Sequence, residues 1–185
     1  MNHNAFTTVG KFSDFKVLLK TLPEGEHQFE YHLDKQFFKN MENPDIRDAD
    51  VKVELDVKHH AGVYDMHFHL TGQLVLLCDR CLDDLPIDID TTYDVTIQYG
   101  EDYNDDSDTL LVIPESDNYL NVAYMIYDTA ALAIPVRHVH PLGKCNRAMS
   151  ALLKKHNARS NDEDSELENQ LIDEMDDMDA QTTDE

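Results

Sequence analysis

The sequence predicts an α+β fold: an antiparallel, strongly curved sheet that tends toward a barrel, one longer packed helix, and a disordered acidic C-terminal tail. Apolar and polar residues alternate through two successive segments, 51–70 and 87–99, which is typical of half-buried antiparallel strands. Between 120 and 134 apolar residues recur at every third and fourth position, which indicates a helix. From 160 to the last residue there are 12 acidic residues and no Lys or Arg.

These patterns divide the 185 residues into three parts. We expect a flexible N-terminus over 1–12, a folded domain over 13–158 and a disordered acidic tail over 159–185. A chain of this length can bury a real hydrophobic core and still carry unpacked sequence.

The net charge of −23 argues against nucleic-acid binding. The part before the tail still carries −11, so the acidity is not confined to the C-terminus. Nucleic-acid binders gain affinity by neutralising phosphates with Lys and Arg, and this charge opposes that. Direct RNA binding is therefore not expected, and a basic protein partner is favoured.

Other features of the composition favour a cytoplasmic protein. No apolar run approaches the roughly 18 residues needed to span a membrane, so no membrane partner is expected. The first residues show neither a basic region nor an apolar region of a secretory signal. Three cysteines, two of them in one CxxC, fit a reducing compartment better than a disulfide framework.

The N-terminal third predicts short strands and a helix. Alternation indicates strands over 15–19 and 29–33, and an aspartate before two aromatic residues places a short helix near Asp34. The Asn-Pro-Asp at 43–45 should end that helix.

The central part predicts a hairpin that leads into the CxxC. Gly62 is placed for the turn, and the second strand, with a bulge near Gly72, should deliver Cys78 at its end. A strand over 87–99 returns from the CxxC.

The remainder predicts an acidic loop, a strand and two helices. The loop spans 100–108, and a short strand over 109–114 follows it. The longer helix is expected over 121–134, capped by Asn121 and ended by a proline, and a further short helix over 146–156.

The thiols leave two interpretations open. Cys78 and Cys81 have the spacing of a zinc knuckle, and Cys145 with His140 or His138 could complete a Cys₃His set. Alternatively, the cysteines are small apolar residues buried at the end of a strand. No cofactor is the first expectation, and a structural zinc ion is the alternative.

A redox role is less favoured. A redox CxxC usually opens a helix after a parallel strand, whereas this one lies between two predicted antiparallel strands. The carboxylates of Asp79, Asp83 and Asp84 should also raise the pKa of a nearby thiol. Neither a nucleophile elbow nor a phosphate-binding loop is present, so no catalytic residue is predicted. Of the ten histidines, His59, His60, His67 and His69 are expected at solvent-facing positions of the hairpin.

The acidic tail contains an apolar stripe at helical spacing that could fold against a basic, apolar groove of a partner. Its residues are Leu167, Leu171, Ile172, Met175 and Met178. Disorder in the free protein is compatible with folding on a partner.

The order of these elements resembles the YceD family, the bacterial large ribosomal RNA subunit accumulation proteins. The resemblance covers roughly 12–158, and its most specific piece is the turn Cys78, Arg80, Cys81 and Leu82 followed by a proline and alternating isoleucines. The segment around 132–145 resembles the Bacteroidetes-type variant of the family.

The resemblance implies a non-enzymatic role in the accumulation or processing of 23S ribosomal RNA. Combined with the charge, it favours action through a basic ribosomal protein, an assembly factor or a nuclease. Arg80 is expected to form a local ion pair with a neighbouring aspartate. The alternative function is a zinc-binding or redox protein that uses Cys78, Cys81 and Cys145.

Overall fold

The computed structural model describes residues 12–107 and 109–156, which form two compact units. The described residues of the first unit are 12–75, 86–107 and 109–135. Those of the second unit are 76–85 and 136–156.

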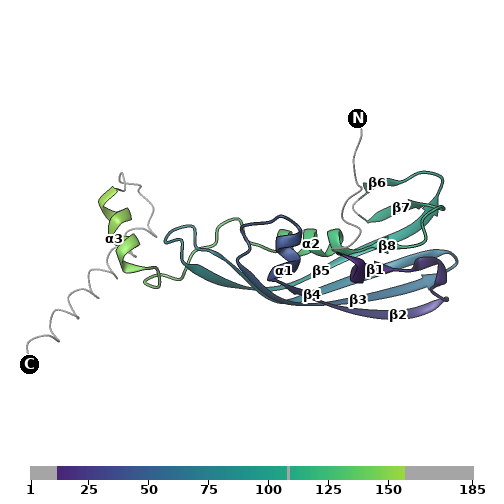
Figure 1. Cartoon of the computed structure of the whole chain (residues 1–185), viewed down its shortest axis with the longest axis horizontal. Coiled ribbons are helices and arrows are strands. Elements are labelled where there is room, and N and C mark those ends of the chain that lie inside the picture. The colour runs from purple at the N-terminus through teal and green to yellow at the C-terminus, as the bar shows by residue number, and fades with distance from the viewer. Residues whose placement is uncertain (1–11, 108, 157–185) are drawn as a thin grey trace, which may run out of the picture. The chain divides into compact units, whose positions relative to one another are not determined.

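A six-stranded sheet with the order β2-β3-β4-β5-β7-β6 dominates the first unit (Figure 1). Its strands are β2 Gly25–Asp34, β3 Asp48–His60, β4 Val63–Leu77, β5 Asp84–Gly100, β6 Asn104–Ser107 and β7 Leu110–Pro114. Strand β3 pairs antiparallel with both β2 and β4, whereas β7 pairs parallel with β5 and antiparallel with β6. The α+β class is thus confirmed.

The prediction that the sheet tends toward a barrel is wrong. Strands β2 and β6 are the two edges of the sheet and do not pair with each other. All four residues of β6 are polar and exposed, so this strand has no apolar side to bury against a closing partner. The sequence interpretation had also assigned β6 to a loop, because its acidic residues carry no apolar alternation.

The predicted hairpin of β3 and β4, with Gly62 in its turn, is confirmed. Ala61 and Gly62 both have positive φ, 49° and 77°, as a two-residue hairpin turn of the primed type requires. Pairing with β3 runs without a shift from His60↔Val63 to Asp48↔Val75, so the bulge predicted near Gly72 is absent from this pairing.

The apolar side chains of the strands form the core of the first unit together with two helices. Figure 1 shows α1, Lys35–Asn40, and α2, Ala123–Leu132, on the same side of the sheet. The predicted helix start near Asp34 is confirmed, because its carboxylate caps α1 by accepting the Phe37 N–H over 2.9 Å. Fully buried side chains of this core include Leu33, Phe38, Val51, Val53, Leu55, Phe68, Leu70, Leu74 and Ile126.

Helix α2 is shorter than the predicted 121–134. Asn121 lies in the short strand β8, Leu120–Asn121, and its Oδ1 accepts the N–H of Ala123 over 3.0 Å. The strand β8 pairs with β1, Lys16–Val17, in a separate two-stranded sheet.

The N-terminal segment is mostly not a strand, although alternation had predicted one over 15–19. Short 3₁₀ helices, Ser13–Phe15 and Leu19–Thr21, flank the two residues of β1. Their turns bury Leu19 and stack Phe15 on Tyr31, with ring centroids 5.1 Å apart.

The second unit contains the tip of the β4–β5 hairpin and helix α3, Arg147–His156, which lies where the sequence predicted a helix. The Asn146 side chain accepts the N–H of Ala148 over 3.0 Å at the start of this helix. The predicted tail over 159–185 lies outside the described residues.

Candidate functional site

The CxxC lies in a tight turn between β4 and β5. The Leu82 N–H donates to the Cys78 carbonyl and the Cys78 N–H donates to the Asp83 carbonyl, both over 2.9 Å. Leu82 has a φ of 61°, a left-handed conformation that closes the turn. Both thiols are buried as a result, while the Leu82 side chain is 60% exposed.

A second segment, which begins near His138, is hydrogen-bonded to Asp79 of this turn. The Asp79 N–H donates to the His138 carbonyl over 3.0 Å, and the His138 N–H donates to Asp79 Oδ2 over 2.8 Å. Asp79 Oδ1 also lies 3.3 Å from His138 Nε2. This exchange aligns the segment so that His140 and Cys145 reach the two thiols.

The four side chains predicted as a zinc-binding set lie together in the second unit. The sulfur atoms of Cys78, Cys81 and Cys145 and one ring nitrogen of His140 lie within 4.8 Å of one another. Cys78 Sγ is 3.9 Å from Cys145 Sγ, and Cys81 Sγ is 3.3 Å from His140 Nδ1. Of the two histidines considered from the sequence, His140 joins the thiols and His138 faces Asp79.

The environment of Cys78 stabilises its thiolate. Burial raises the pKa of this thiol, but the backbone N–H groups of Cys81, His140 and Arg80 outweigh burial and lower the pKa to about 6. The His140 N–H donates to the sulfur over 3.4 Å. The prediction that neighbouring carboxylates raise the thiol pKa is therefore wrong for Cys78, and the carboxylate of Asp79 instead bonds His138.

Cys145 behaves in the opposite way. Burial, followed by the neighbouring thiols of Cys81 and Cys78, raises the pKa of Cys145 to about 12. An ionised thiolate in this cluster therefore disfavours ionisation of a second thiol. A bound cation would offset the repulsion between the two thiolates.

Two further predictions concern Arg80 of the turn and the apolar stripe of the tail. Arg80 is half-buried in the turn, and its predicted ion pair stays a prediction. The stripe of Leu167, Leu171, Ile172 and Met175 lies outside the described residues.

The first unit presents a polar sheet face, which we define as the side of β2–β5 opposite α1 and α2. The strand registers and cross-strand hydrogen bonds arrange its side chains in rows that run across the strands. Four of these rows are Glu26–Lys58–Asp65–Thr96, Gln28–Asp56–His67–Asp94, Glu30–Glu54–His69–Asp90 and Asp34–Asp50–Gln73–Asp88. Every one of these rows contains at least two carboxylates.

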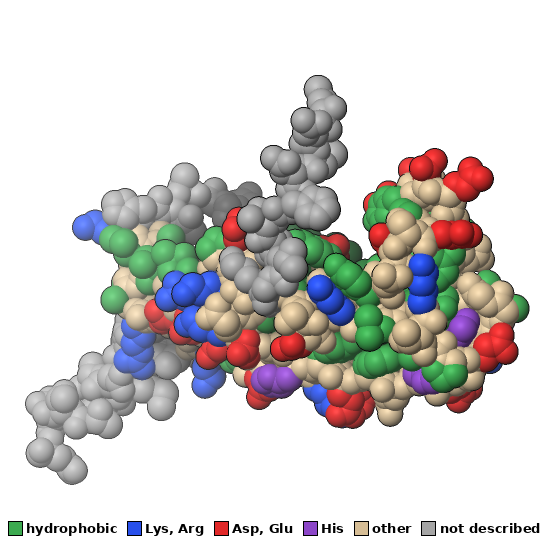
Figure 2. All heavy atoms as spheres, turned by 45° about the vertical axis from the view of Figure 1, so that its right-hand side comes forward, with side chains coloured by type: hydrophobic (Ala, Val, Ile, Leu, Met, Phe, Trp, Pro, Cys, Tyr) green, Lys and Arg blue, Asp and Glu red, His purple; other side chains and the backbone are tan. Residues whose placement is uncertain are grey.

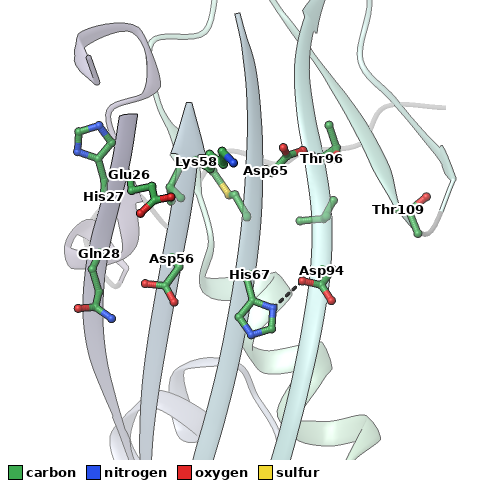
Figure 3. Close-up of a pocket in the computed structure, with 13 residues that line it drawn as sticks. Glu26, His27, Gln28, Asp56, Lys58, Asp65, His67, Asp94, Thr96 and Thr109 are labelled. Carbon is green, nitrogen blue, oxygen red and sulfur yellow. Dashed lines mark hydrogen bonds and ion pairs between the residues drawn. The ribbon is translucent and has the colours of Figure 1, made fainter. Parts of the chain in front are cut away.

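Histidines lie between carboxylates on this face. His67 Nδ1 is 2.6 Å from Asp94 Oδ1 (Figure 3), and His69 Nε2 is 2.9 Å from Asp90 Oδ1. In the space-filling view, acidic and histidine side chains gather along the lower margin of the first unit (Figure 2).

Part of the polar sheet face is hollowed into a pocket of about 770 Å³. Figure 3 shows that its labelled side chains come from the neighbouring strands β2–β5, apart from Thr109 in the turn before β7, with Gln28, Asp56, His67 and Asp94 in one row. Sequence reasoning assigned these strand positions to solvent one strand at a time and missed the common face. Carboxylates in the polar phase of successive strands were the signal for it.

Comparison with known proteins places these features in a family. The sequence model of the large ribosomal RNA subunit accumulation protein YceD matches residues 66–179, which is more than half of the chain. The chain belongs to the YceD family. The matched residues include the CxxC turn, β5, α2 and the segment with His140 and Cys145. No curated protein and no solved structure matches the chain.

The family description names a protein of large ribosomal RNA subunit accumulation, as the sequence resemblance implied. The Bacteroidetes-type assignment stays a prediction. Among the helices within 12–107 and 109–156, none is both long and apolar enough to cross a membrane.

Proposed function

We propose that this chain is a non-enzymatic assembly factor of the large ribosomal subunit that acts in the cytoplasm. In this proposal it holds a basic segment of a protein of the assembling subunit on its polar sheet face. It thereby promotes the accumulation and processing of 23S ribosomal RNA without binding that RNA itself.

The observation that carries the proposal is the repeat of carboxylates on the polar sheet face. Same-face side chains along a strand are two residues apart, or about 6.6 Å, and neighbouring strands are about 4.8 Å apart. An extended basic segment has the same repeat between its alternate side chains. Its Lys and Arg residues could therefore meet a carboxylate at successive rows, such as those of Asp65, Asp56 and Glu54.

The charge of the rows supports a protein partner over RNA. Lys58 is the one lysine in the four rows defined above, and Lys52 lies between two of them with its ammonium group 3.3 Å from Glu30 and 2.8 Å from Glu54. Phosphates would meet net negative charge here, which opposes binding by counterion release. A basic protein meets the opposite field, which favours fast and selective association.

A binding experiment with the whole chain tests this proposal. The probe is nuclease-treated total protein of the large ribosomal subunit, and bound proteins are identified by mass spectrometry at low and high salt. The face variant combines Glu26→Gln, Asp56→Asn and Asp94→Asn. Its matched control, Asp102→Asn with Asp105→Asn and Asp106→Asn, removes the same charge from exposed residues in and beside β6.

We expect the unaltered chain and the control to retain one or a few basic large-subunit proteins in a salt-dependent manner, and the face variant to lose them. Replacing the gene with the face variant should then lower mature 23S RNA. Equal retention by the face variant would overturn the role of this face. Binding of purified 23S RNA with a steep salt dependence would overturn the choice of partner. A chain that lacks 160–185 tests separately whether the predicted tail stripe contributes.

A further inference from the structure

We propose that Cys78, Cys81, His140 and Cys145 bind one Zn²⁺ ion in a closed structural site. The ion would fasten the β4–β5 turn to the segment that carries His140 and Cys145. This inference goes beyond the proposed function and does not depend on it.

Two of the distances between the ligand atoms are close to those around a tetrahedral zinc ion. Zinc binds thiolate sulfur at about 2.3 Å and imidazole nitrogen at about 2.0–2.1 Å, so its ligand atoms lie about 3.5–3.8 Å apart. The 3.9 Å between the sulfurs of Cys78 and Cys145 is close to that range. The 3.3 Å between Cys81 Sγ and His140 Nδ1 is slightly short of it.

The donor set selects the metal. Three thiolates and one imidazole are soft and borderline ligands, which favour zinc over the oxygen-seeking ions magnesium and calcium. All four tetrahedral positions are filled by protein side chains, so no position remains for a water molecule or a substrate. The site is accordingly structural and not catalytic.

The surroundings of the set match those of a metal-bound thiolate. The His140 N–H points at Cys78 Sγ over 3.4 Å, so a ligand residue also supports a neighbouring ligand. Asp79 holds His138 through both its backbone and its carboxylate, and this fixes the backbone two residues before His140.

The second unit buries few apolar side chains, so a bound ion would stabilise it. Among the described residues of the second unit, the buried apolar side chains are Leu76, Leu85 and the three cysteines. Two leucines supply little hydrophobic stabilisation, and small domains of this kind are usually stabilised by a metal or by disulfides. No pair of these cysteines is bonded as a disulfide. Zinc binding would add folding free energy to this unit.

The test uses the full chain, purified without a histidine tag, and measures zinc by elemental analysis. Two histidine variants form a matched pair: His140→Gln removes a proposed ligand, and His138→Gln removes a nearby imidazole that is not one. Cys145→Ser removes a thiolate. Cobalt substitution reports the coordination directly, because tetrahedral thiolate-bound Co²⁺ has intense visible bands.

We expect one zinc ion per chain in the unaltered protein and in His138→Gln, and tetrahedral thiolate bands with cobalt. In a chelator competition, His140→Gln should lose more than the roughly 10- to 100-fold of affinity that loss of an outer-shell partner produces. Cys145→Ser should lose the ion and the cobalt bands, while circular dichroism still reports the sheet of the first unit.

Absence of zinc together with three freely titrating thiols, or a Cys78–Cys145 disulfide in freshly purified protein, would overturn the site. So would equal zinc affinity of His138→Gln and His140→Gln. None of these results would alter binding at the polar sheet face, so the two proposals fail separately.

Discussion

Asp79 holds His138 by two contacts of one carboxylate: Oδ2 accepts the His138 backbone N–H over 2.8 Å, and Oδ1 lies 3.3 Å from its Nε2. The two residues are 59 positions apart in the chain. Because His140 follows two residues later, this contact holds the backbone next to the imidazole that lies against the thiols.

Asp79 is therefore a positioning residue for the proposed zinc site. Asp79→Ala should leave one zinc ion per chain but weaken its binding roughly 10- to 100-fold, as measured by competition with a chelator. Asp79→Asn keeps an acceptor for the His138 N–H and should recover part of the loss. Asp83→Ala removes the same charge from the same turn. An equal loss of zinc affinity in that variant would show that Asp79 acts through its charge and not through its contacts with His138.

The local features of the fold and the residues of the candidate metal site were predictable from the sequence. Period-two alternation predicted the β3–β4 hairpin, and Asp34 before two aromatic residues predicted the start of α1, because both signals act between near neighbours in the chain. The residue types of Cys78, Cys81, Cys145 and His140 were enough to name a ligand set.

What the sequence did not reveal depends on contacts between distant segments. The parallel pairing of β7 with β5 brings the polar strand β6 to the edge, and neither strand carries a local signal for this order. The low pKa of Cys78 comes from backbone N–H groups, among them that of His140, whose orientation no side-chain pattern records.

Cys78 should ionise at unusually low pH in the reduced chain from which metal has been removed. Its pKa of about 6 means that the thiolate predominates at pH 7, whereas the pKa of Cys145 at about 12 keeps that thiol protonated. Thiolate ultraviolet absorbance should rise in a step near pH 6 that Cys78→Ser abolishes. A step near pH 6 that survives in Cys78→Ser would show that the backbone N–H groups stabilise the thiolate of another cysteine.

The ion pairs of Lys52 should make a pH-dependent contribution to the stability of the first unit. Hydrogen bonds with Glu54 and Glu30 raise the pKa of Lys52, and the bond with Lys52 lowers the pKa of Glu54. A lowered carboxyl pKa gives stability that is lost as the pH falls through it. A raised ammonium pKa gives stability that is lost as the pH rises through it.

The difference in Tm between the unaltered chain and Lys52→Gln should thus be largest near neutral pH and shrink at both extremes. It should be small, since these side chains are exposed, and smaller still at high salt. A difference that stays constant with pH would mean that the variant acts through packing of the lysine stem.

Gly72 is required by the approach of the neighbouring strand β3. A Cβ on this residue would lie 2.2 Å from the Asp50 carbonyl oxygen, and its φ of 150° is unfavourable for any residue with a side chain. Gly72→Ala combines backbone strain with a backbone clash, so we expect a loss of about 3–5 kcal/mol in the free energy of unfolding.

Gly62→Ala is the matched control for this loss, measured for both variants by urea unfolding. Gly62 also has a positive φ, 77°, but nothing lies within 4 Å of the added Cβ. Strain alone should then cost about 1–2 kcal/mol. Equal losses in the two variants would show that β3 and β4 can separate at Gly72 to admit a methyl group. If Gly62→Ala loses less free energy of unfolding than Gly72→Ala, the difference is due to the close, unshifted pairing of β3 and β4 at Gly72.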